Sequence, residues 1–408
     1  MTIQIKTPDI RFESFSGDWQ DKGIGSILAE TRRPVELLDN ELYQLVTVKR
    51  RNEGVVARAS LKGKDILVKN YFGIKAGDYL ISKRQVVHGA NGIVPESLDN
   101  AVVSNEYLVV TDSDEITAKF WTVISKRHQM HKLFFISSYG VDIEKLVFDV
   151  TDWKSRVITI PDVTEQSAIT DYFRQLDNLI NQHQQKHDKL SNIKKAMLEK
   201  MFPKQGETIP EIRFKGFSGE WEERSLTEEA VVTTGYPFDS ADFSEDGDLL
   251  VITNGNIQNS SSAVDGNVGN RIASEKVAHL NQYKLNLGDI LVTMDGSVGR
   301  TAKVIDRNQI LAQRVGRLVA RNNTEFLYQS LNTGVFLETM TTISHGGTIK
   351  HISLSEIGSY IVQVPKDLNE QAKIGAYLKK LDDLIERHQQ QITKLNNIKQ
   401  ACLSKMFV

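Results

Sequence analysis

The sequence predicts an α+β protein with two mixed α/β bodies joined by two long helices that pair as an antiparallel coiled coil. Three observations support this fold class: the length of 408 residues, a duplicated chain plan, and apolar residues repeating at helical spacing in two segments. A chain of this length exceeds one ordinary hydrophobic core, so two globular units are expected. With 40% hydrophobic and 25% charged residues, both halves can bury a core.

Two segments occur twice. The opening repeat reads PDIRFESFSGDW at residues 8–19 and PEIRFKGFSGEW at residues 210–221, with eight identities in twelve positions. The closing repeat spans residues 165–202 and 370–407, with 21 identities in 38 positions. The chain is therefore two tandem copies of one plan, each with an opening repeat, a body and a closing repeat.

The bodies, residues 20–160 and 222–364, share almost no sequence beyond Gly77-Asp78 against Gly288-Asp289. Similar repeats around dissimilar bodies favour one scaffold that carries two specificities, although an old duplication with drifting loops remains the alternative. The predicted boundaries are 1–160 for the first body with its opening repeat, 161–203 for the first helix, 204–364 for a linker and the second body, and 365–408 for the second helix.

Each closing repeat has a heptad pattern of apolar residues, which predicts a helix of about 36 residues, roughly 54 Å long, with a partner helix along its length. The predicted interface residues are Ile169, Tyr172, Leu176, Leu179, His183, Leu190 and Ile193 in the first copy, and Ile374, Tyr377, Leu381, Leu384, His388, Leu395 and Ile398 in the second. Pro203 ends the first helix.

We expect the two helices to pair with each other in antiparallel orientation. That arrangement predicts a central polar layer with His183 near Gln391 and Lys186 near His388, which lowers stability but fixes the register. Cys402 occupies a heptad core position and is expected to be a small buried hydrophobic side chain.

The usual catalytic motifs are missing from the sequence. It has no phosphate-binding GxxxxGK[ST] loop, no HExxH zinc motif, no GxSxG nucleophile motif, and no Asn/Asp-Pro-Pro-aromatic signature of amino-methyltransferases. The stretch Asp295–Thr301 is rich in glycine but lacks the spacing and the lysine of a phosphate loop. We therefore predict no catalytic residues and no metal ligands on this chain.

Basic residues are concentrated in one window of each body. Residues 44–92 contain ten basic residues, Lys69 among them, against three acidic ones, and residues 296–321 contain six against one. Arginine and lysine on strands and loops reach phosphates and the edges of bases. For any single cation a solvated surface position is equally plausible. The candidate DNA-binding residues are Lys49, Arg50, Arg51, Lys62, Lys64, Lys83, Arg84, Asn91, Arg300, Lys303, Arg314 and Arg317.

Other features limit the location of the protein. A single cysteine excludes an internal disulfide and fits a reducing cytosol. The sequence has no run of about 18 apolar residues, so we expect no membrane span and a cytoplasmic protein.

The frame of the chain resembles the specificity subunits of type I restriction–modification enzymes over nearly its whole length. The most specific part is the junction of the second body with its helix, where the matching residues are Gly347-Thr348, Ile352, Leu354, Ile357, Val364-Pro365, Glu370-Gln371, Ile374, Leu378, Leu381-Asp382 and Ile385. The first copy matches from Pro161 and Glu165-Gln166 onward but lacks the Gly-Thr element upstream.

The resemblance implies that each body is a target recognition domain that reads one half of an asymmetric, bipartite site in double-stranded DNA. It also implies that the helices set the spacing and dock methyltransferase (modification) subunits, with restriction subunits as translocases. S-adenosylmethionine, ATP and Mg²⁺ are then expected on those partners, and this chain binds no cofactor. The alternatives are a coiled-coil assembly scaffold that does not bind DNA and an enzyme with an unrecognised site.

Overall fold

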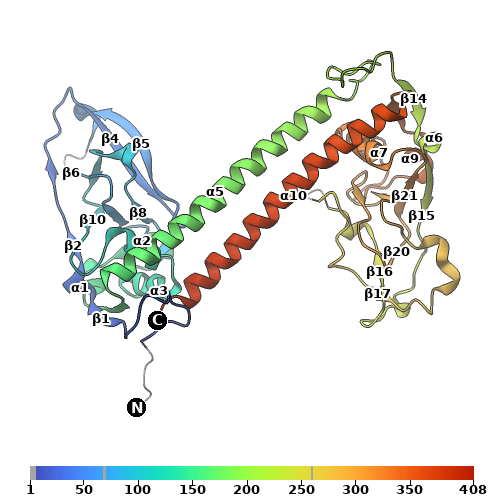
Figure 1. Ribbon diagram of the computed structural model, residues 1–408. Helices are drawn as coiled ribbons and strands as arrows, with labels where there is room; N and C mark the ends of the chain where they lie inside the picture. Colours follow the sequence, from blue (N-terminus) through green and yellow to red (C-terminus); the bar gives the residue numbers. More distant parts are fainter. Residues whose placement is uncertain (1–5, 68–69, 259–260) are drawn as a thin grey trace. The chain divides into compact units, whose positions relative to one another are not determined.

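The computed structural model describes residues 6–67, 70–258 and 261–408. The chain divides into two compact units. The first unit contains residues Met1–Gln182 together with Gln391–Val408, and the second unit contains His183–Gln390. Each unit thus holds one body, its opening repeat and portions of both long helices (Figure 1).

The two closing repeats form the long helices α5 (Val163–Lys200) and α10 (Leu368–Lys405), each of 38 residues. At 1.5 Å per residue each helix is about 57 Å long. The Asp162 side chain accepts a hydrogen bond from the Glu165 amide, which satisfies one free donor at the start of α5. The sequence prediction of two long helices is confirmed.

The helices run antiparallel in each unit. In the first unit, Tyr172 Oη lies 3.6 Å from Cys402 Sγ, and Asp177 pairs with Lys399. In the second unit, His183 Nδ1 lies 2.9 Å from His388 Nδ1. The residue number increases on one helix as it decreases on the other, in agreement with the predicted orientation.

The seam between the helices differs from the predicted one near its centre. Lys186 and Gln391 are exposed, and the neighbouring His187 and Ile392 take the inward positions. Leu179 is 42% exposed for the same reason, because half-buried Ile180 replaces it on the seam. The inward residues still repeat every 3.5 residues on average, at Leu176, Ile180, His183, His187 and Leu190, so the predicted pattern took the wrong one of two neighbouring positions in each heptad.

The other predicted seam positions are buried or half-buried. They pack into the core of their own unit or lie beside it: Ile169, Tyr172, Leu176, Leu395 and Ile398 in the first unit, and Leu190, Ile193, Ile374, Tyr377 and Leu381 in the second. Leu384 is half-buried. Cys402 is 8% exposed, as a small core side chain should be.

The polar layer is a direct histidine pair, in which His183 meets His388 where the prediction placed Gln391. Lys186 lies near His388, as predicted. Burial lowers the pKa of His388, and the nearby positive groups of His183, Lys186 and His187 lower it further. Because the unfolded chain then binds the proton more readily, this histidine favours folding above about pH 6.5 and loses that contribution as the pH falls.

We predict that the melting temperature of the wild type falls more between pH 7.5 and pH 5.5 than that of His388→Gln, which has no proton to gain there. Differential scanning fluorimetry across this pH range measures the difference. Parallel pH profiles of the two proteins would contradict the prediction.

An ion pair between the helices is duplicated at the 205-residue offset of the closing repeats. Asp177 of α5 pairs with Lys399 of α10 in the first unit, and in the second unit Lys194 Nζ lies 2.5 Å from Asp382 Oδ1. The Lys194 and Asp382 side chains are 18% and 15% exposed, so water screens this pair only partly. The duplicated pair therefore helps to fix the antiparallel register.

We predict that Asp382→Lys destabilises the second unit by about 3 kcal/mol, since it places two lysines together in a partly buried site. The double variant Asp382→Lys with Lys194→Asp should recover more than half of that loss. Denaturant unfolding followed by circular dichroism measures both. If the double variant is as unstable as the single one, the pair does not fix the register.

The first body contains short strands and helices around two main sheets. Its strands are β1 (Gln20–Gly23), β2 (Ala29–Glu30), β3 (Pro34–Val35), β4 (Leu42–Lys49), β5 (Gly54–Lys62), β6 (Tyr71–Gly73), β7 (Tyr79–Ser82), β8 (Asn91–Ile93), β9 (Val102–Ser104), β10 (Tyr107–Thr111), β11 (Ser138–Tyr139), β12 (Val147–Phe148) and β13 (Val157–Ile160). Its α-helices are α1 (Ile24–Ile27), α2 (Ala118–Ile124), α3 (His128–Ile136) and α4 (Val150–Lys154).

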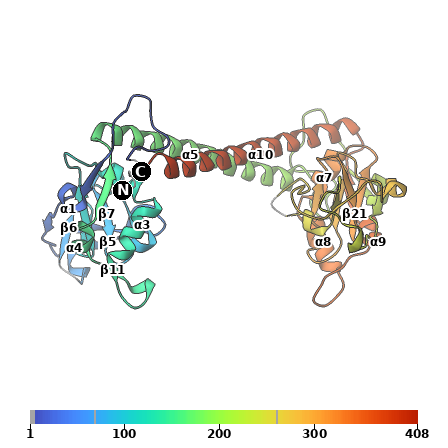
Figure 2. The same ribbon diagram turned by 90° about the horizontal axis from the view of Figure 1, so that it is seen from below.

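The second body repeats this plan with fewer strands. They are β14 (Glu222–Ser225), β15 (Ala230–Thr234), β16 (Leu249–Ile252), β17 (Arg271–Ile272), β18 (Ile290–Thr293), β19 (Thr301–Lys303), β20 (Gln309–Leu311), β21 (Val315–Ala320) and β22 (Ile361–Val364). The α-helices are α6 (Leu226–Glu229), α7 (Thr324–Leu331), α8 (Val335–Ile343) and α9 (Leu354–Ser359) (Figure 2).

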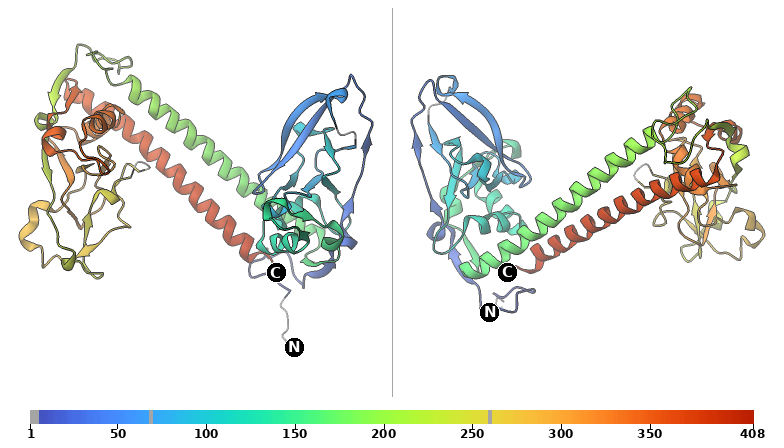
Figure 3. Two further views of the ribbon diagram at one scale, coloured as in Figure 1. Left: turned by 180° about the vertical axis from the view of Figure 1, so that it is seen from behind. Right: turned by 45° about the horizontal axis from the view of Figure 1, so that its top comes forward.

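One sheet has the same topology in both bodies despite their unrelated sequences. The strand order is β2-β10-β7-β8 in the first body and β15-β21-β18-β19 in the second, antiparallel throughout. The other main sheet differs: it has five strands in the order β3-β6-β9-β4-β5 in the first body and three in the order β17-β16-β20 in the second. In the first body, β4 and β5 form a long ribbon (Figure 3). The shared scaffold therefore carries two different second sheets.

The faint sequence match between the bodies is a turn that precedes the central strand of the shared sheet. Gly77 and Gly288 both have φ 91°, a left-handed conformation that favours glycine. The following aspartate, Asp78 or Asp289, accepts a backbone hydrogen bond of 2.8 Å from the residue three positions earlier. The residues that match between the two body sequences therefore form the same turn in both bodies.

The opening repeat connects one long helix to the other within each unit. In the first unit, the Ile10 amide donates to the carbonyl of Lys405 at the end of α10, while Arg11 forms two hydrogen bonds of 2.8 Å to Glu165 in the first turn of α5. In the second unit, Ile212 and Arg213 make the same contacts with Lys200 and Glu370. These contacts explain why both repeats share the same residues.

The end of each helix completes the core of a unit. Phe407, two residues beyond α10, packs edge-on against Trp19 with ring centroids 5.9 Å apart, inside the first unit. Phe202, two residues beyond α5, packs in the same way on Trp221 in the second unit. The last residues of the chain thus belong to the core of the unit that holds the first residues (Figure 2).

Candidate nucleic-acid interface

The predicted basic residues of the first body lie in two separate places. Lys49, Arg50 and Arg51 are exposed at the turn between β4 and β5. Lys62 and Lys64 are exposed at the other end of the ribbon, because the register pairs Lys49 with Gly54 and Leu42 with Lys62. At about 3.3 Å per residue the two ends are roughly 25 Å apart. Lys69 lies outside the described residues.

The β4–β5 turn has a constrained backbone. Arg51 and Asn52 have φ 59° and φ 57°, in the left-handed region that few residues other than glycine adopt. Their amides donate to the carbonyls of His88 and Gly89, which holds the turn against the short helix that follows β7. Such strained positions persist only where the surroundings hold them, and they gather at functional sites.

Arg50 reaches a carboxylate on the segment between β11 and β12. Its Nη2 lies 2.7 Å from Glu144 Oε2, and His88 Nε2 lies 3.7 Å from Glu144 Oε1. Both charged side chains of the Arg50–Glu144 pair are about half exposed, so the pair contributes little to stability and its groups remain accessible. We name Arg50, Glu144 and His88 the first cluster.

Lys83 and Arg84 follow β7. Lys83 Nζ donates to the carbonyl of Asn105, and Arg84 Nε lies 2.8 Å from Glu106 Oε2 at an exposed position. Hydrogen bonding to Glu106 raises the pKa of Arg84, whereas burial lowers the pKa of Lys83. Both remain candidates for contact with DNA.

Asn91 does not fit a role in reading bases. It is 2% exposed on β8, where the sequence prediction required an accessible amide. Its position in the shared sheet explains the burial, because β8 pairs with the central strand β7. The prediction for Asn91 is wrong.

Two of the predicted basic residues of the second body form ion pairs inside the protein. Arg317 Nη2 lies 2.7 Å from Asp289 Oδ2, with side chains 10% and 4% exposed. Lys303 Nζ lies 2.5 Å from Glu325 Oε2 and 4.6 Å from the centre of the Tyr328 ring. A count of basic residues in a sequence window does not show whether a cation is paired with a carboxylate. Both side chains are paired in this way, so the prediction that they bind DNA is wrong.

Arg300 is half-buried and lines a cavity of about 790 Å³ between the second body and the long helices of the second unit. Lys194 and Asp382, the duplicated interhelical pair, line the same cavity. A role for Arg300 in DNA contact stays a prediction.

Arg314 lies on the turn between β20 and β21 and has φ 67°. Its Nη1 lies 2.9 Å from Asp295 Oδ2, and His351 Nδ1 lies 2.6 Å from Asp295 Oδ1. The exposed fractions of the side chains are 59% for Arg314, 44% for His351 and 19% for Asp295. We name these three residues the second cluster.

The sequence analysis did not identify Glu144, His88 or His351, and it weighed Asp295 only as part of a phosphate-binding loop. Arg50 and Glu144 are 94 positions apart in the chain, so no local motif joins them. A left-handed turn that carries an exposed arginine can be recognised from the three-dimensional structure but not from the sequence.

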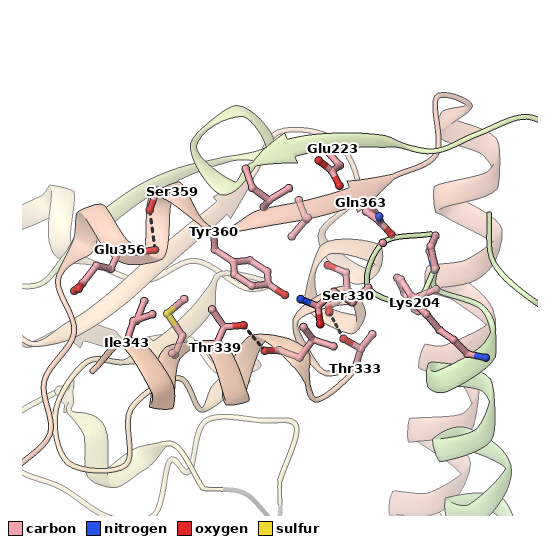
Figure 4. A pocket seen from close by; sticks show the side chains of 18 residues that line it. Lys204, Glu223, Ser330, Thr333, Thr339, Ile343, Glu356, Ser359, Tyr360 and Gln363 are labelled. Atoms are coloured by element: carbon pink, nitrogen blue, oxygen red, sulfur yellow. Dashed lines mark hydrogen bonds between the residues drawn. The ribbon is translucent and has the colours of Figure 1, made fainter. Parts of the chain in front are cut away.

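The second unit also has a cavity of about 430 Å³ beside α8, α9 and β22 (Figure 4). The hydroxyls of Thr333, Thr339 and Ser359 donate to carbonyls of their own helical segments, so they are not aimed at a ligand. Burial raises the pKa of Tyr360 to about 12, which keeps its phenol protonated. The cavity has no acid–base pair or activated nucleophile among these groups.

Two further observations concern the described part of the chain. No group of three or more His, Cys, Asp or Glu side chains within residues 6–67, 70–258 and 261–408 is placed to hold a metal ion. Over the same residues, no helix has a stretch long and apolar enough to cross a bilayer.

Comparison with known proteins shows what the chain is similar to. The model of the type I restriction modification DNA specificity domain matches residues 218–397. Over 424 aligned residues the chain is 22% identical to the type I restriction enzyme MjaVIII specificity subunit of Methanocaldococcus jannaschii, covering 96% of this chain and 92% of that protein. Residues 218–397 therefore resemble a type I DNA specificity domain, and the chain as a whole is similar to a type I specificity subunit.

One solved structure shares the fold of this chain, and a second is only similar to it. The S subunit of the type I restriction-modification system from M. genitalium has a TM-score of 0.58 and 16% identity, covering 98% of this chain and 99% of that chain. The HsdS subunit from Thermoanaerobacter tengcongensis has a TM-score of 0.45 and 15% identity, covering 95% and 96%. The match to a DNA specificity domain over residues 218–397 favours DNA recognition over an assembly scaffold.

Proposed function

We propose that this chain is the DNA-reading, non-catalytic subunit of a type I restriction–modification complex, in which each body reads one half of a bipartite, asymmetric site. One observation carries the proposal: two bodies of unrelated sequence share a four-stranded sheet but differ in the second sheet. A constant scaffold with variable reading elements suits two unrelated half-sites, because specificity resides in side chains that reach base edges.

The long helices set the spacing between the half-sites and dock the methyltransferase subunits in this proposal. A helix of about 57 Å exceeds one turn of DNA, which rises about 34 Å. The duplicated ion pairs and the Arg–Glu contacts at the helix ends support a fixed register. Changing α5 and α10 by one heptad should alter the unread spacer by about three base pairs.

The chemistry belongs to the partner subunits. We propose that modification subunits bind S-adenosylmethionine and methylate DNA, and that restriction subunits use ATP and Mg²⁺ to translocate and cut. The complex then acts in the cytoplasm. In support, Glu144 and Asp295, the carboxylates of the two clusters, each contact an arginine that they can hold in position.

Selection from a library of random double-stranded DNA tests this function. The specificity subunit, isolated with the proteins that copurify with it, should enrich one sequence with two defined segments and an undefined spacer. Exchanging residues 20–160 for the corresponding body of a relative should change one segment only. Enrichment of no sequence would overturn the proposal, and changes in both segments would overturn the assignment of one half-site to each body.

A further inference from the structure

The two clusters contain the same kinds of side chain although their residues come from different places in the two bodies. Each has an arginine on a left-handed turn or next to one, a carboxylate that the arginine contacts, and a histidine beside the same carboxylate. The carboxylate of the first cluster lies between β11 and β12, whereas that of the second cluster follows β18. A duplicated frame does not explain this likeness, because the body sequences do not match at these positions.

The pairing of arginine with carboxylate determines what the cluster can bind. Arg314 contacts Asp295 through Nη1, which leaves Nη2 and Nε as donors on a side chain that is 59% exposed. The pair has no net charge, and a DNA phosphate would be repelled by the Asp295 carboxylate. The edge of a base is neutral, so it meets no such repulsion.

We infer that Arg50 of the first cluster and Arg314 of the second are the residues that read guanine, one in each half-site. An arginine fork donates to guanine O6 and N7 in the major groove. The carboxylate holds the guanidinium in place before DNA arrives. In the second cluster the histidine in turn holds the carboxylate, because His351 Nδ1 lies 2.6 Å from Asp295 Oδ1. In the first cluster His88 Nε2 lies 3.3 Å from the Ile143 carbonyl oxygen and 3.7 Å from Glu144 Oε1. This inference rests on the proposed DNA-reading function and assigns residues to it.

The backbone of Arg314 supports a functional role. A residue other than glycine at φ 67° costs stability, so the surrounding contacts must hold it there. The Arg314 carbonyl accepts a hydrogen bond of 3.2 Å from the Met294 amide. Gln313 on the same turn donates its amide to Tyr236, so the turn is fixed to the second body. The strained backbone conformation of Arg314 therefore sets the direction in which its side chain leaves the turn.

The same random-duplex selection tests the inference with Arg50→Lys and Arg314→Lys. Lysine keeps the charge but loses the two-pronged geometry. Arg50→Lys should lose about tenfold in discrimination at one guanine of the first half-site and leave the second unchanged, and Arg314→Lys should do the reverse. Arg58→Lys and Arg307→Lys, at exposed sites of the same bodies, are matched controls that should leave the sequence unchanged.

The variant Arg314→Gly tests whether the side chain reads a base without lowering the stability of the fold. Glycine adopts φ 67° freely, so this variant should melt no lower than the wild type while losing the same guanine preference. A uniform loss of affinity for all duplexes with a weaker salt dependence would show phosphate contact and overturn the inference. Unchanged preference in both lysine variants would also overturn it. A wild type without any sequence preference would instead reject the proposed function.

Discussion

Phe407→Ala should unfold the first unit far more readily, although this residue is the last but one of 408. Its ring is 5% exposed and packs against Trp19 and Phe120, and the Arg127 guanidinium lies 4.5 Å from the ring centre. Removing a buried aromatic ring leaves a cavity and costs about 3–5 kcal/mol. Hydrogen exchange measured by mass spectrometry should show lost protection in the first body, while peptides of residues 210–360 keep theirs.

Phe202→Ala is the matched variant, because Phe202 takes the same place in the second unit. Phe202→Ala should reduce protection from hydrogen exchange in the second body only. Phe135→Ala is the surface control, since that ring is 53% exposed. If Phe407→Ala reduced protection equally in both bodies, the assignment of the chain end to the first unit would be wrong.

Arg11→Ala should destabilise the first unit by about 3 kcal/mol, because it leaves the Glu165 carboxylate, 2% exposed, without its partner. Arg213→Ala should do the same to the second unit through Glu370, which is 1% exposed. The guanidinium also donates to two backbone carbonyls in each unit, so the turn of the opening repeat should loosen as well. Urea unfolding with unit-resolved hydrogen exchange measures the loss.

The double variant Arg11→Ala with Glu165→Gln is the control for buried charge. It removes the unpaired carboxylate, so it should be more stable than Arg11→Ala alone. Equal stability of the two variants would mean that the arginine acts through its backbone contacts and not through the carboxylate.

The sequence was sufficient to predict the repeats, the long helices and their antiparallel pairing, because spacing of apolar residues follows directly from helix geometry. It was not sufficient to predict which residues face inward at the centre of the seam between the two helices. Leu179 and Ile180 are both apolar, and the structure buries Ile180 more than Leu179. Two neighbouring apolar residues each continue a heptad pattern, so their spacing alone does not show which one faces the partner helix.

The candidate interface was predictable only in part. Exposed Arg50 and Arg314 lie in the basic windows, but so do Arg317 and Lys303, whose carboxylate partners bury them. Long-range pairing decides which cations remain accessible, and a sequence window contains no information about it. The acidic and histidine members of the two clusters were missed for the same reason.

The split composition of the first unit has a consequence for synthesis on the ribosome. The second unit is one continuous stretch, His183–Gln390, so all of its residues have been made before the chain is finished. The first unit lacks Trp19's partner ring until Phe407 has been made, after the whole of the second unit, which reverses the usual order in which N-terminal domains fold first. Residues of the first body therefore wait, incompletely packed, for Gln391–Val408 to be synthesised.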